Sequence, residues 1–434
     1  MIPLVDYENR AEKLRAILGR SASFSDEVDA AAREILGDVQ QRGAEAMLDY
    51  TERFDDVRPD PLKVSQAALD EAAGALSDDL RAVIEEAAAN VRRFHQKQTR
   101  ESWFTDDGDG TVLGQRVAPV ERAGLYVPGG TAAYPSSLLM TAIPAQVAGV
   151  REIHLVSPPQ PDGHPHPHVL ATAALLGLEN VYAVGGAQAV GALAFGAEPV
   201  PAVDKIVGPG NAYVAAAKRQ VFGRVDIDSV AGPSEIVVLA DDSARPDWVA
   251  ADLLSQAEHD GRASAVLVTP HRPLAKAVRE AVEEQIVGLP RREIVAQALA
   301  DYGACVTTPS LEEAVALTNE LAPEHLEIQT REPWNVMTKI RHAGAIFLGA
   351  HSSEPAGDYF AGPNHVLPTG GTARYASALG TDDFLRTQSV ISYSEKKMRR
   401  DAPQIAAFAR AEELEAHARA VERRFKKKML QKKD

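Results

Sequence analysis

Gln256 and His259 are the first residues in this sequence whose types and spacing could bind a metal ion. The segment 251–256 has a helical pattern, and side chains three residues apart meet on one face of a helix. Asp358 lies in a later loop punctuated by Gly and Pro, and His417 lies in a helical segment near the C-terminus. Oxygen and imidazole ligands without thiolates suit Zn²⁺, or Mn²⁺ and Co²⁺ as substitutes. Each piece alone is more often a solvated surface, so the metal site is a hypothesis that requires the pieces to converge.

Glu324 and His325 place two proton-transfer groups side by side, directly after Pro323 and among apolar residues. An imidazole with a pKa near neutrality can take a proton from an alcohol, and a carboxyl group with a raised pKa can activate water. The alternative is a helix start, with a proline and an acidic residue in its first turn. Both interpretations are open, and the first predicts a catalytic acid–base pair.

Three glycine-containing loops follow short apolar runs and could contact a nucleotide. Ligands of open α/β sheets bind outside the carboxyl ends of the strands, where glycines let a phosphate approach the backbone. The G-x-G-x-x-G fingerprint of ordinary dinucleotide binding is absent. Each loop alone is more simply a tight turn, but three in one region favour a nucleotide. The loops are 126–130, 185–188 and 208–211, and their polar side chains are Tyr126, Gln188 and Asn211.

Length and composition are those of an ordinary globular enzyme. The 434 residues suggest about three domains, and 45% hydrophobic and 25% charged residues allow a sizeable core. The net charge of −15 argues against a broad nucleic-acid or anionic-membrane surface. Cys305 is the lone cysteine, which excludes an internal disulfide and favours a reducing compartment. The start lacks a signal-peptide pattern, and no apolar run reaches the ~20 residues of a membrane span, so we expect a cytoplasmic protein.

Two patterns along the chain indicate an α/β fold. The first hundred residues have helical periodicity, and from about residue 124 short apolar runs alternate with Ala-rich helical segments. Such repeats predict mainly parallel sheets, and two Rossmann-like halves are the simplest interpretation. We expect a separate helical element from Phe384 onward, and a surface loop, rather than a metal site, at the histidines of 164–168. The predicted strands are 124–127, 152–156, 181–184, 205–207, 235–240, 264–269, 304–307 and 345–348.

Five motifs, taken together and in order, closely resemble histidinol dehydrogenase, and the resemblance runs essentially end to end. It implies a zinc-requiring homodimer that oxidises L-histidinol to L-histidine, the last step of histidine biosynthesis. The reaction would use two NAD-linked hydride transfers through a bound L-histidinaldehyde. The motifs are Gly208-Pro209-Gly210-Asn211, Ser255-Gln256-Ala257-Glu258-His259, Ala322-Pro323-Glu324-His325-Leu326, Gly357-Asp358-Tyr359 and Gly362-Pro363-Asn364-His365-Val366-Leu367-Pro368.

The same resemblance implies two incomplete Rossmann-like domains with small helical N- and C-terminal elements, which would explain the missing glycine fingerprint. Residues 1–21 would form the N-terminal helical element. Residues 22–125 and 236–380 would form the domain with the metal and catalytic residues, and residues 126–235 the NAD-binding domain. Residues 381–434 would form a C-terminal helical dimerisation element.

Site residues carry over from the resemblance by motif. One zinc ion per subunit would be bound partly by the partner subunit of the homodimer, and the zinc ligands, together with His325, would also contact L-histidinol. The implied roles are zinc ligation by Gln256, His259, Asp358 and His417 of the partner subunit; catalysis by Glu324 and His325; substrate binding by Ser234, His365 and Glu412; and NAD binding by Tyr126, Gln188 and Asn211.

Glu413 departs from the pattern of the family, which has a glycine at the corresponding place before Leu414. Glutamate has a much higher helix propensity than glycine. We therefore expect the replacement to favour a helix here and to be tolerated.

Three other functions remain open from the sequence. A relative that oxidises another polar alcohol would keep the zinc ligands, although Ser234, Glu324, His365 and Glu412 favour histidinol. A zinc hydrolase would use Glu324 to activate water and would turn over without a nicotinamide. A non-catalytic dimer held together by the metal would leave the Glu324–His325 pair unexplained.

Overall fold

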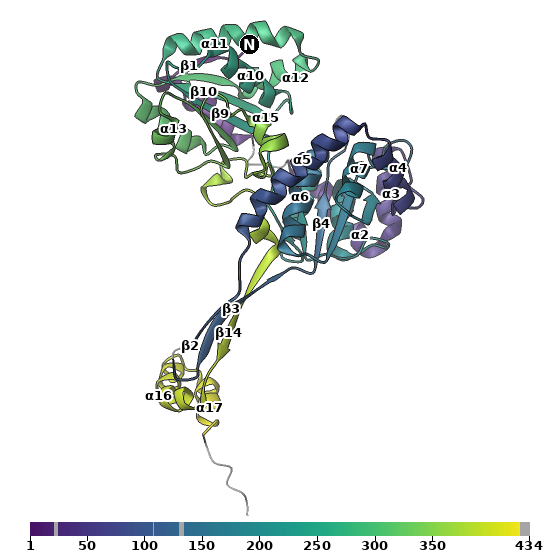
Figure 1. Ribbon diagram of the computed structural model, residues 1–434, viewed down its shortest axis with the longest axis vertical. Coiled ribbons are helices and arrows are strands. Elements are labelled where there is room, and N and C mark those ends of the chain that lie inside the picture. The colour runs from purple at the N-terminus through teal and green to yellow at the C-terminus, as the bar shows by residue number, and fades with distance from the viewer. Residues whose placement is uncertain (21–24, 107, 130–133, 426–434) are drawn as a thin grey trace, which may run out of the picture. The chain divides into compact units, whose positions relative to one another are not determined.

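The computed structural model describes residues 1–20, 25–106, 108–129 and 134–425, which fall into two compact units. The first unit is Met1–Thr99 with Val120–Phe384, and the second is Arg100–Pro119 with the chain from Leu385. Two parallel sheets lie in the first unit and a small antiparallel sheet in the second (Figure 1). None of the helices in the described ranges combines the length and the apolar content that crossing a membrane requires.

A six-stranded parallel sheet forms one half of the first unit. The strand order is β1 (Leu4–Asp6), β11 (Ala304–Thr307), β10 (Ser264–Thr269), β9 (Glu235–Ala240), β12 (His325–Gln329) and β13 (Ala345–Leu348). Its helices are α1 (Ala11–Gly19), α10 (Pro246–Ala257), α11 (Arg272–Gln285), α12 (Arg292–Tyr302), α13 (Leu311–Leu321) and α14 (Pro333–Met337). Because side chains alternate along β9, Ile236 and Val238 pack with α10–α12, while Val237 and Leu239 pack with α1 and α13. Helices on both faces explain why the central strands are continuous apolar runs.

A five-stranded parallel sheet forms the other half. The strand order is β6 (Asn180–Ala183), β5 (Glu152–Ser157), β4 (Arg122–Tyr126), β7 (Lys205–Val207) and β8 (Asp226–Ile227). The helices that follow its strands are α6 (Pro135–Ala148), α7 (Pro167–Leu175), α8 (Gly186–Phe195) and α9 (Ala212–Val221). Four earlier helices surround it as well (Figure 1): α2 (Asp26–Arg42), α3 (Ala44–Asp55), α4 (Gln66–Gly74) and α5 (Asp78–His95). The α/β class with two Rossmann-like halves is confirmed.

The packing of the early helices corrects the predicted grouping of residues 22–125 with 236–380. α2 and α3 share one apolar core with α8 and α9, and α4 and α5 share another with α6 and α7, so these helices belong with the five-stranded sheet. Residues 1–20 also differ from the predicted separate element, because β1 pairs with β11 of the six-stranded sheet; residue 21 lies outside the described residues. An amphipathic pattern shows that a helix buries one face, but it does not identify the sheet that covers that face.

The second unit combines an internal segment with the C-terminal region. Its antiparallel sheet has the order β14 (Leu385–Ser392), β3 (Val112–Pro119) and β2 (Trp103–Asp106), and α16 (Glu395–Ala411) and α17 (Glu415–Glu422) complete it. The predicted element 381–434, described as far as residue 425, thus contains two helices but also a strand, which pairs with residues far earlier in the chain. Several large apolar side chains of this unit are exposed: Trp103, Phe104, Ile391, Phe408 and Leu414.

Glu413 is not helical, which corrects the expectation that glutamate favours a helix at this position. α16 ends at Ala411, and Glu413 has a φ of 62°, in the left-handed region. The turn is closed by N–H donation from Glu413 to the Arg410 carbonyl at 3.0 Å and from Leu414 to the Ala409 carbonyl at 2.8 Å. This pattern at a helix end normally selects glycine, because a Cβ strains the left-handed conformation.

Replacement of Glu413 by glycine should therefore stabilise the protein by about 1 kcal/mol, since the strained residue becomes unstrained. Chemical unfolding at several protein concentrations would measure the change. The matched control is Ala407→Gly, at an exposed position inside α16, which should lower the free energy of unfolding by about 0.5–1 kcal/mol. A loss of stability in Glu413→Gly would contradict this account of the turn.

Candidate functional site

Glu324 and His325 lie at the amino end of β12, beside the amino end of β9. His325 begins β12 and stands opposite Ile236 of β9 in the parallel ladder. The helix-start interpretation of Pro323 and Glu324 is therefore wrong, because the chain passes from α13 through a turn into a strand. α10 runs back from the carboxyl end of β9, so its last turn returns to this same edge. The candidate catalytic pair thus lies at the edge opposite to the one where open sheets usually bind ligands.

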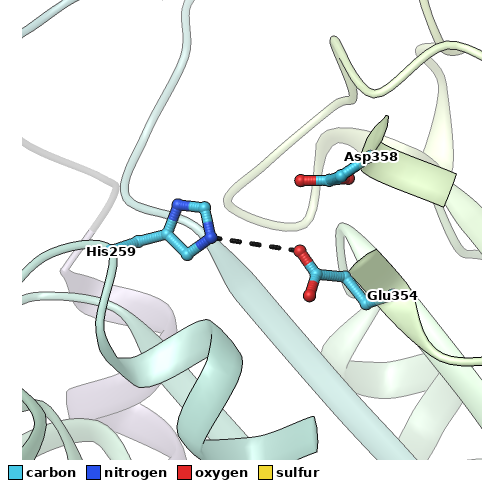
Figure 2. A group of neighbouring side chains, drawn as sticks. All are labelled: His259, Glu354 and Asp358. Atoms are coloured by element: carbon cyan, nitrogen blue, oxygen red, sulfur yellow. Dashed lines mark ion pairs between the residues drawn. The ribbon is translucent and has the colours of Figure 1, made fainter. Parts of the chain in front are cut away.

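His259, Glu354 and Asp358 are the described residues that come close enough to hold one metal ion. Their ligand atoms lie within 4.8 Å of one another, and the three side chains point toward a common centre (Figure 2). His259 lies just past the end of α10, and its Nε2 is 3.9 Å from Glu354 Oε1. Glu354 begins α15 (Glu354–Ala356), and Asp358 is in the π-helical turn that continues it (Gly357–Ala361). The spacing of four places both carboxyl groups beside the same imidazole.

Gln256 supplies a further potential ligand from the last turn of α10. Its side chain is fully buried, and neither its Oε1 nor its Nε2 has a hydrogen-bond partner among the described residues. Asp358 Oδ1 is buried and unpartnered in the same way. Buried polar atoms almost always find partners, so unpartnered ones at a cluster of ligands fit a cation site. The donors are oxygen and imidazole nitrogen, which suits zinc.

His325 lies between the carboxyl groups of Glu324 and Asp358. Its Nδ1 is 3.6 Å from Glu324 Oε2, and its Nε2 is 3.7 Å from Asp358 Oδ1. Burial raises the pKa of Glu324 to about 8, helped by the carboxylates of Glu235 and Asp358 and opposed by His325. Burial lowers the pKa of His325, but the charges of Glu324 and Asp358 outweigh it and raise that pKa to about 10. Each pKa depends on the charge of the neighbour, which suits a pair that passes protons.

A backbone contact selects the tautomer of His325. Its Nδ1 lies 3.0 Å from the carbonyl oxygen of Glu235, and a carbonyl oxygen can only accept, so Nδ1 carries the hydrogen. In the neutral imidazole the lone pair is then on Nε2, which has no hydrogen-bond partner among the described residues. Nε2 is therefore the atom that gains or loses the proton when His325 changes its protonation state. His365 is oriented similarly, with its Nδ1 3.0 Å from the carbonyl oxygen of Asp358.

Glu354 and Glu235 are site residues that the sequence patterns did not indicate. Glu354 is 1% exposed, its Oε2 accepts a hydrogen bond from Ser255 Oγ at 2.9 Å, and burial raises its pKa to about 7. The spacing of four between Glu354 and Asp358 is the signal that could have revealed it. Glu235 donates its backbone N–H to Glu324 Oε2 at 2.8 Å. Glu235 directly follows Ser234, but the sequence pattern does not otherwise predict its contact with Glu324, because the two residues are far apart in the chain.

The three candidate nucleotide loops lie at the carboxyl edge of the five-stranded sheet. Tyr126 ends β4, and its hydroxyl accepts a hydrogen bond from the Gly186 N–H at 3.0 Å. Asn211 caps α9, since its Oδ1 accepts from two backbone N–H groups of the first turn. Both side chains thus have structural roles in the turns. Gln188 is 1% exposed, and its Oε1 has no partner in the described part of the chain, which leaves an atom for a ligand. Gly130, at the end of the first loop, lies outside the described residues.

Ser234 is half-buried directly before β9, next to the residue that contacts Glu324. Glu412 and His417 are exposed residues of the second unit, around the turn between α16 and α17. Their contact with a zinc ion or substrate stays a prediction. The histidine loop takes no part in the metal-ligand group: His166 Nδ1 accepts the N–H of His168 at 3.2 Å and caps α7.

Comparisons with known proteins lead to one family. The family model described as histidinol dehydrogenase matches residues 18–425. A histidinol dehydrogenase of Geobacillus kaustophilus is 58% identical over 405 residues, covering 93% of this chain and 96% of that protein. One of Bacillus subtilis is 54% identical over 392 residues, covering 90% and 92%. The crystal structure of histidinol dehydrogenase from Elizabethkingia anophelis is 37% identical, covers 98% of each chain and superposes with a TM-score of 0.91. This chain belongs to the histidinol dehydrogenase family.

Proposed function

We propose that this chain oxidises L-histidinol to L-histidine in two NAD-linked steps, through bound L-histidinaldehyde and with one zinc ion per subunit. The observation that carries the proposal is the buried Glu324–His325 pair, in which His325 Nε2 lies 3.7 Å from Oδ1 of Asp358, a member of the candidate metal-ligand group. Membership of the family supports the substrate. The acid–base pair supports a reaction that must remove protons first from an alcohol and then from water.

Gln256, His259 and Asp358 would hold the zinc ion, with His417 of the partner subunit as the fourth ligand. The clustering of His259 with two carboxyl groups and the unpartnered amide of Gln256 support this assignment. A bound zinc ion would act as a Lewis acid that orients the amino alcohol. The carboxyl group of Glu354 would lie beside the zinc ligands, where its protonation state would change the net charge of the site.

His325 would act as the base in both oxidation steps. Its Nε2 takes the proton of the hydroxyl group while the carbinol carbon loses a hydride to NAD, which produces the aldehyde. Glu324 then takes a proton from the water that adds to the aldehyde carbonyl, and His325 returns its proton to the former carbonyl oxygen, which gives the hydrate and frees Nε2. His325 takes a proton from this hydrate as a second hydride leaves, and the resulting carboxylic acid loses its remaining proton to solvent as the carboxylate of L-histidine. One substrate thus consumes one water and two oxidised cofactors. Holding the aldehyde in a buried site avoids its release between the steps.

The remaining assigned residues would bind L-histidinol and NAD. Ser234, His365 and Glu412 would hold L-histidinol, and His365 presents its Nε2 because its Nδ1 contacts the Asp358 carbonyl. NAD would contact Tyr126, Gln188 and Asn211, and the unpartnered Oε1 of Gln188 supports this most directly.

A homodimer would complete the site, because His417 would come from the partner subunit. The exposed apolar side chains of the second unit, which include Trp103, Phe104, Ile391 and Phe408, support such a contact. Exposed apolar patches of this kind commonly mark protein interfaces.

Purified protein should reduce two equivalents of NAD for each L-histidinol consumed, because both steps release a hydride. Spectrophotometry of NADH, combined with quantification of L-histidine, would measure the ratio. Chelation should abolish the activity and added zinc should restore it. A product formed without any nicotinamide would indicate a hydrolase instead, and oxidation of other polar alcohols with no activity on L-histidinol would also contradict the proposal.

A further inference from the structure

Glu235 contacts both members of the Glu324–His325 pair through its backbone. Its N–H donates to Glu324 Oε2 at 2.8 Å, and its carbonyl oxygen lies 3.0 Å from His325 Nδ1. Both contacts depend on the pairing of β9 with β12, in which His325 stands opposite Ile236. A single residue of β9 therefore fixes the position of the carboxyl group and the tautomer of the imidazole.

The side chain of Glu235 also contacts the backbone of Glu324. Its Oε2 accepts the backbone N–H of Glu324 at 3.3 Å, so the two glutamates exchange hydrogen bonds between backbone and carboxylate across the strands. Its Oε1 accepts from the Gly370 N–H at 3.0 Å and from Arg20 Nη2 at 2.7 Å. One carboxylate thereby ties the start of β12 to the segment around Gly370 and to the end of α1.

Arg20 is the counter-ion of this carboxylate and also donates hydrogen bonds to two backbone carbonyl groups. The ion pair is buried, with side-chain exposures of 1% for Arg20 and 10% for Glu235. Its Nε donates to the carbonyl of Arg262 at 3.0 Å, and its Nη1 donates to the carbonyl of Ile17. A buried guanidinium requires a negative partner and several acceptors, and this one has both. The pair therefore favours the charged form of the Glu235 carboxylate and opposes the burial that raises its pKa.

We propose that Glu235 and Arg20 are positioning residues that hold Glu324 and His325 in their reactive geometry. This inference rests on the proposed function. A carboxylate that must meet a water, and an imidazole that must meet a hydroxyl group, lose much of their rate when they are displaced by about 1 Å. Loss of the Glu235 carboxylate should therefore slow the chemical steps and leave the zinc ligands and the NAD loops unchanged.

Glu235→Gln tests this proposal, because it keeps the side-chain shape but removes the charge and one acceptor oxygen. We expect kcat to fall at least about tenfold, more strongly for aldehyde oxidation, while KM for NAD and zinc per subunit stay at wild-type values. Val238→Ala, a buried position of the same strand, is the matched control. It should lower Tm and keep kcat. A wild-type kcat in Glu235→Gln would overturn the proposal.

The double variant Arg20→Met with Glu235→Gln separates positioning from stability. Glu235→Gln should also lower Tm, because it leaves the buried Arg20 cation without its counter-ion. Removing the cation together with its counter-ion should restore this Tm but leave kcat low. If kcat returned together with Tm, the pair would have only a structural role and the proposal would fail. Lack of L-histidinol oxidation by the wild-type protein would contradict the proposed function instead. A crystal structure of Glu235→Gln would then still test whether the Glu324 carboxyl group leaves its position.

Discussion

Glu324→Gln is expected to oxidise L-histidinol to the aldehyde at close to the wild-type rate and to oxidise the aldehyde about 10²- to 10⁴-fold more slowly. The reason is that only the second step needs a carboxylate that takes a proton from water. Burial raises the pKa of Glu324 to about 8, so the carboxylate that takes this proton becomes the main form only as the pH rises toward 8. Glutamine has the same shape and can still accept the N–H of Glu235, but it cannot take a proton. NADH formation measured separately with L-histidinol and with L-histidinaldehyde would distinguish the two steps.

His325→Asn supplies the contrast for this experiment. We expect both steps to slow by a similar factor, because the Nε2 of His325 takes a proton in each of them. Glu320→Gln, at the exposed end of α13, is the matched control for the loss of a carboxylate and should behave as the wild type. An equal loss of both steps in Glu324→Gln would remove the separate role assigned to Glu324.

A randomly exchanged mixture of His259→Ala and His417→Ala subunits should regain about a quarter of the wild-type activity, although each variant alone should be inactive. In a site built from two subunits, one site of a mixed dimer lacks both histidines, while the other has both intact. About half of the dimers are mixed after random exchange, and each has one complete site out of two. Activity after joint refolding, with zinc per dimer measured in the same samples, would test this expectation.

The control for subunit mixing uses two proposed zinc ligands that belong to the same subunit. His259→Ala mixed with Asp358→Ala should give no recovery, because every site then lacks one of these two neighbouring residues. Recovery in this control, or none in the mixture with His417→Ala, would contradict a site shared between subunits.

Buried strands were the feature most readily predicted from the sequence. The runs 235–240, 264–269, 304–307 and 345–348 coincide with β9, β10, β11 and β13, because strands covered by helices on both faces are continuous apolar segments. The same pattern did not predict β12. It begins at His325 and contains Glu327, and buried charged residues in a strand hide its apolar character. His325 belongs to the candidate site, and Glu327 accepts the backbone N–H of Glu354 at 2.9 Å, so the polar residues that obscured the strand pattern lie in or beside that site.

Residue types and short spacings determined the candidate chemistry. The neighbouring pair Glu324–His325 and the candidate ligands His259 and Asp358 could be selected because proton transfer and zinc binding require such groups. Glu354 and Glu235 could not be selected in this way. Each matters because of a partner far away in the chain: His259 for Glu354, and Glu324 for Glu235.

The amino-acid sequence by itself determined the α/β class, the family and the side chains able to do the chemistry, since these depend on residue type and local periodicity. Tertiary structure alone decided that α2 to α5 cover the five-stranded sheet, and that the Glu324–His325 pair lies at the amino edge of the other sheet. It also decided that Glu235 links Glu324 to Arg20. Strand order and helix docking depend on contacts between distant segments, and the local pattern of a segment is compatible with more than one such partner.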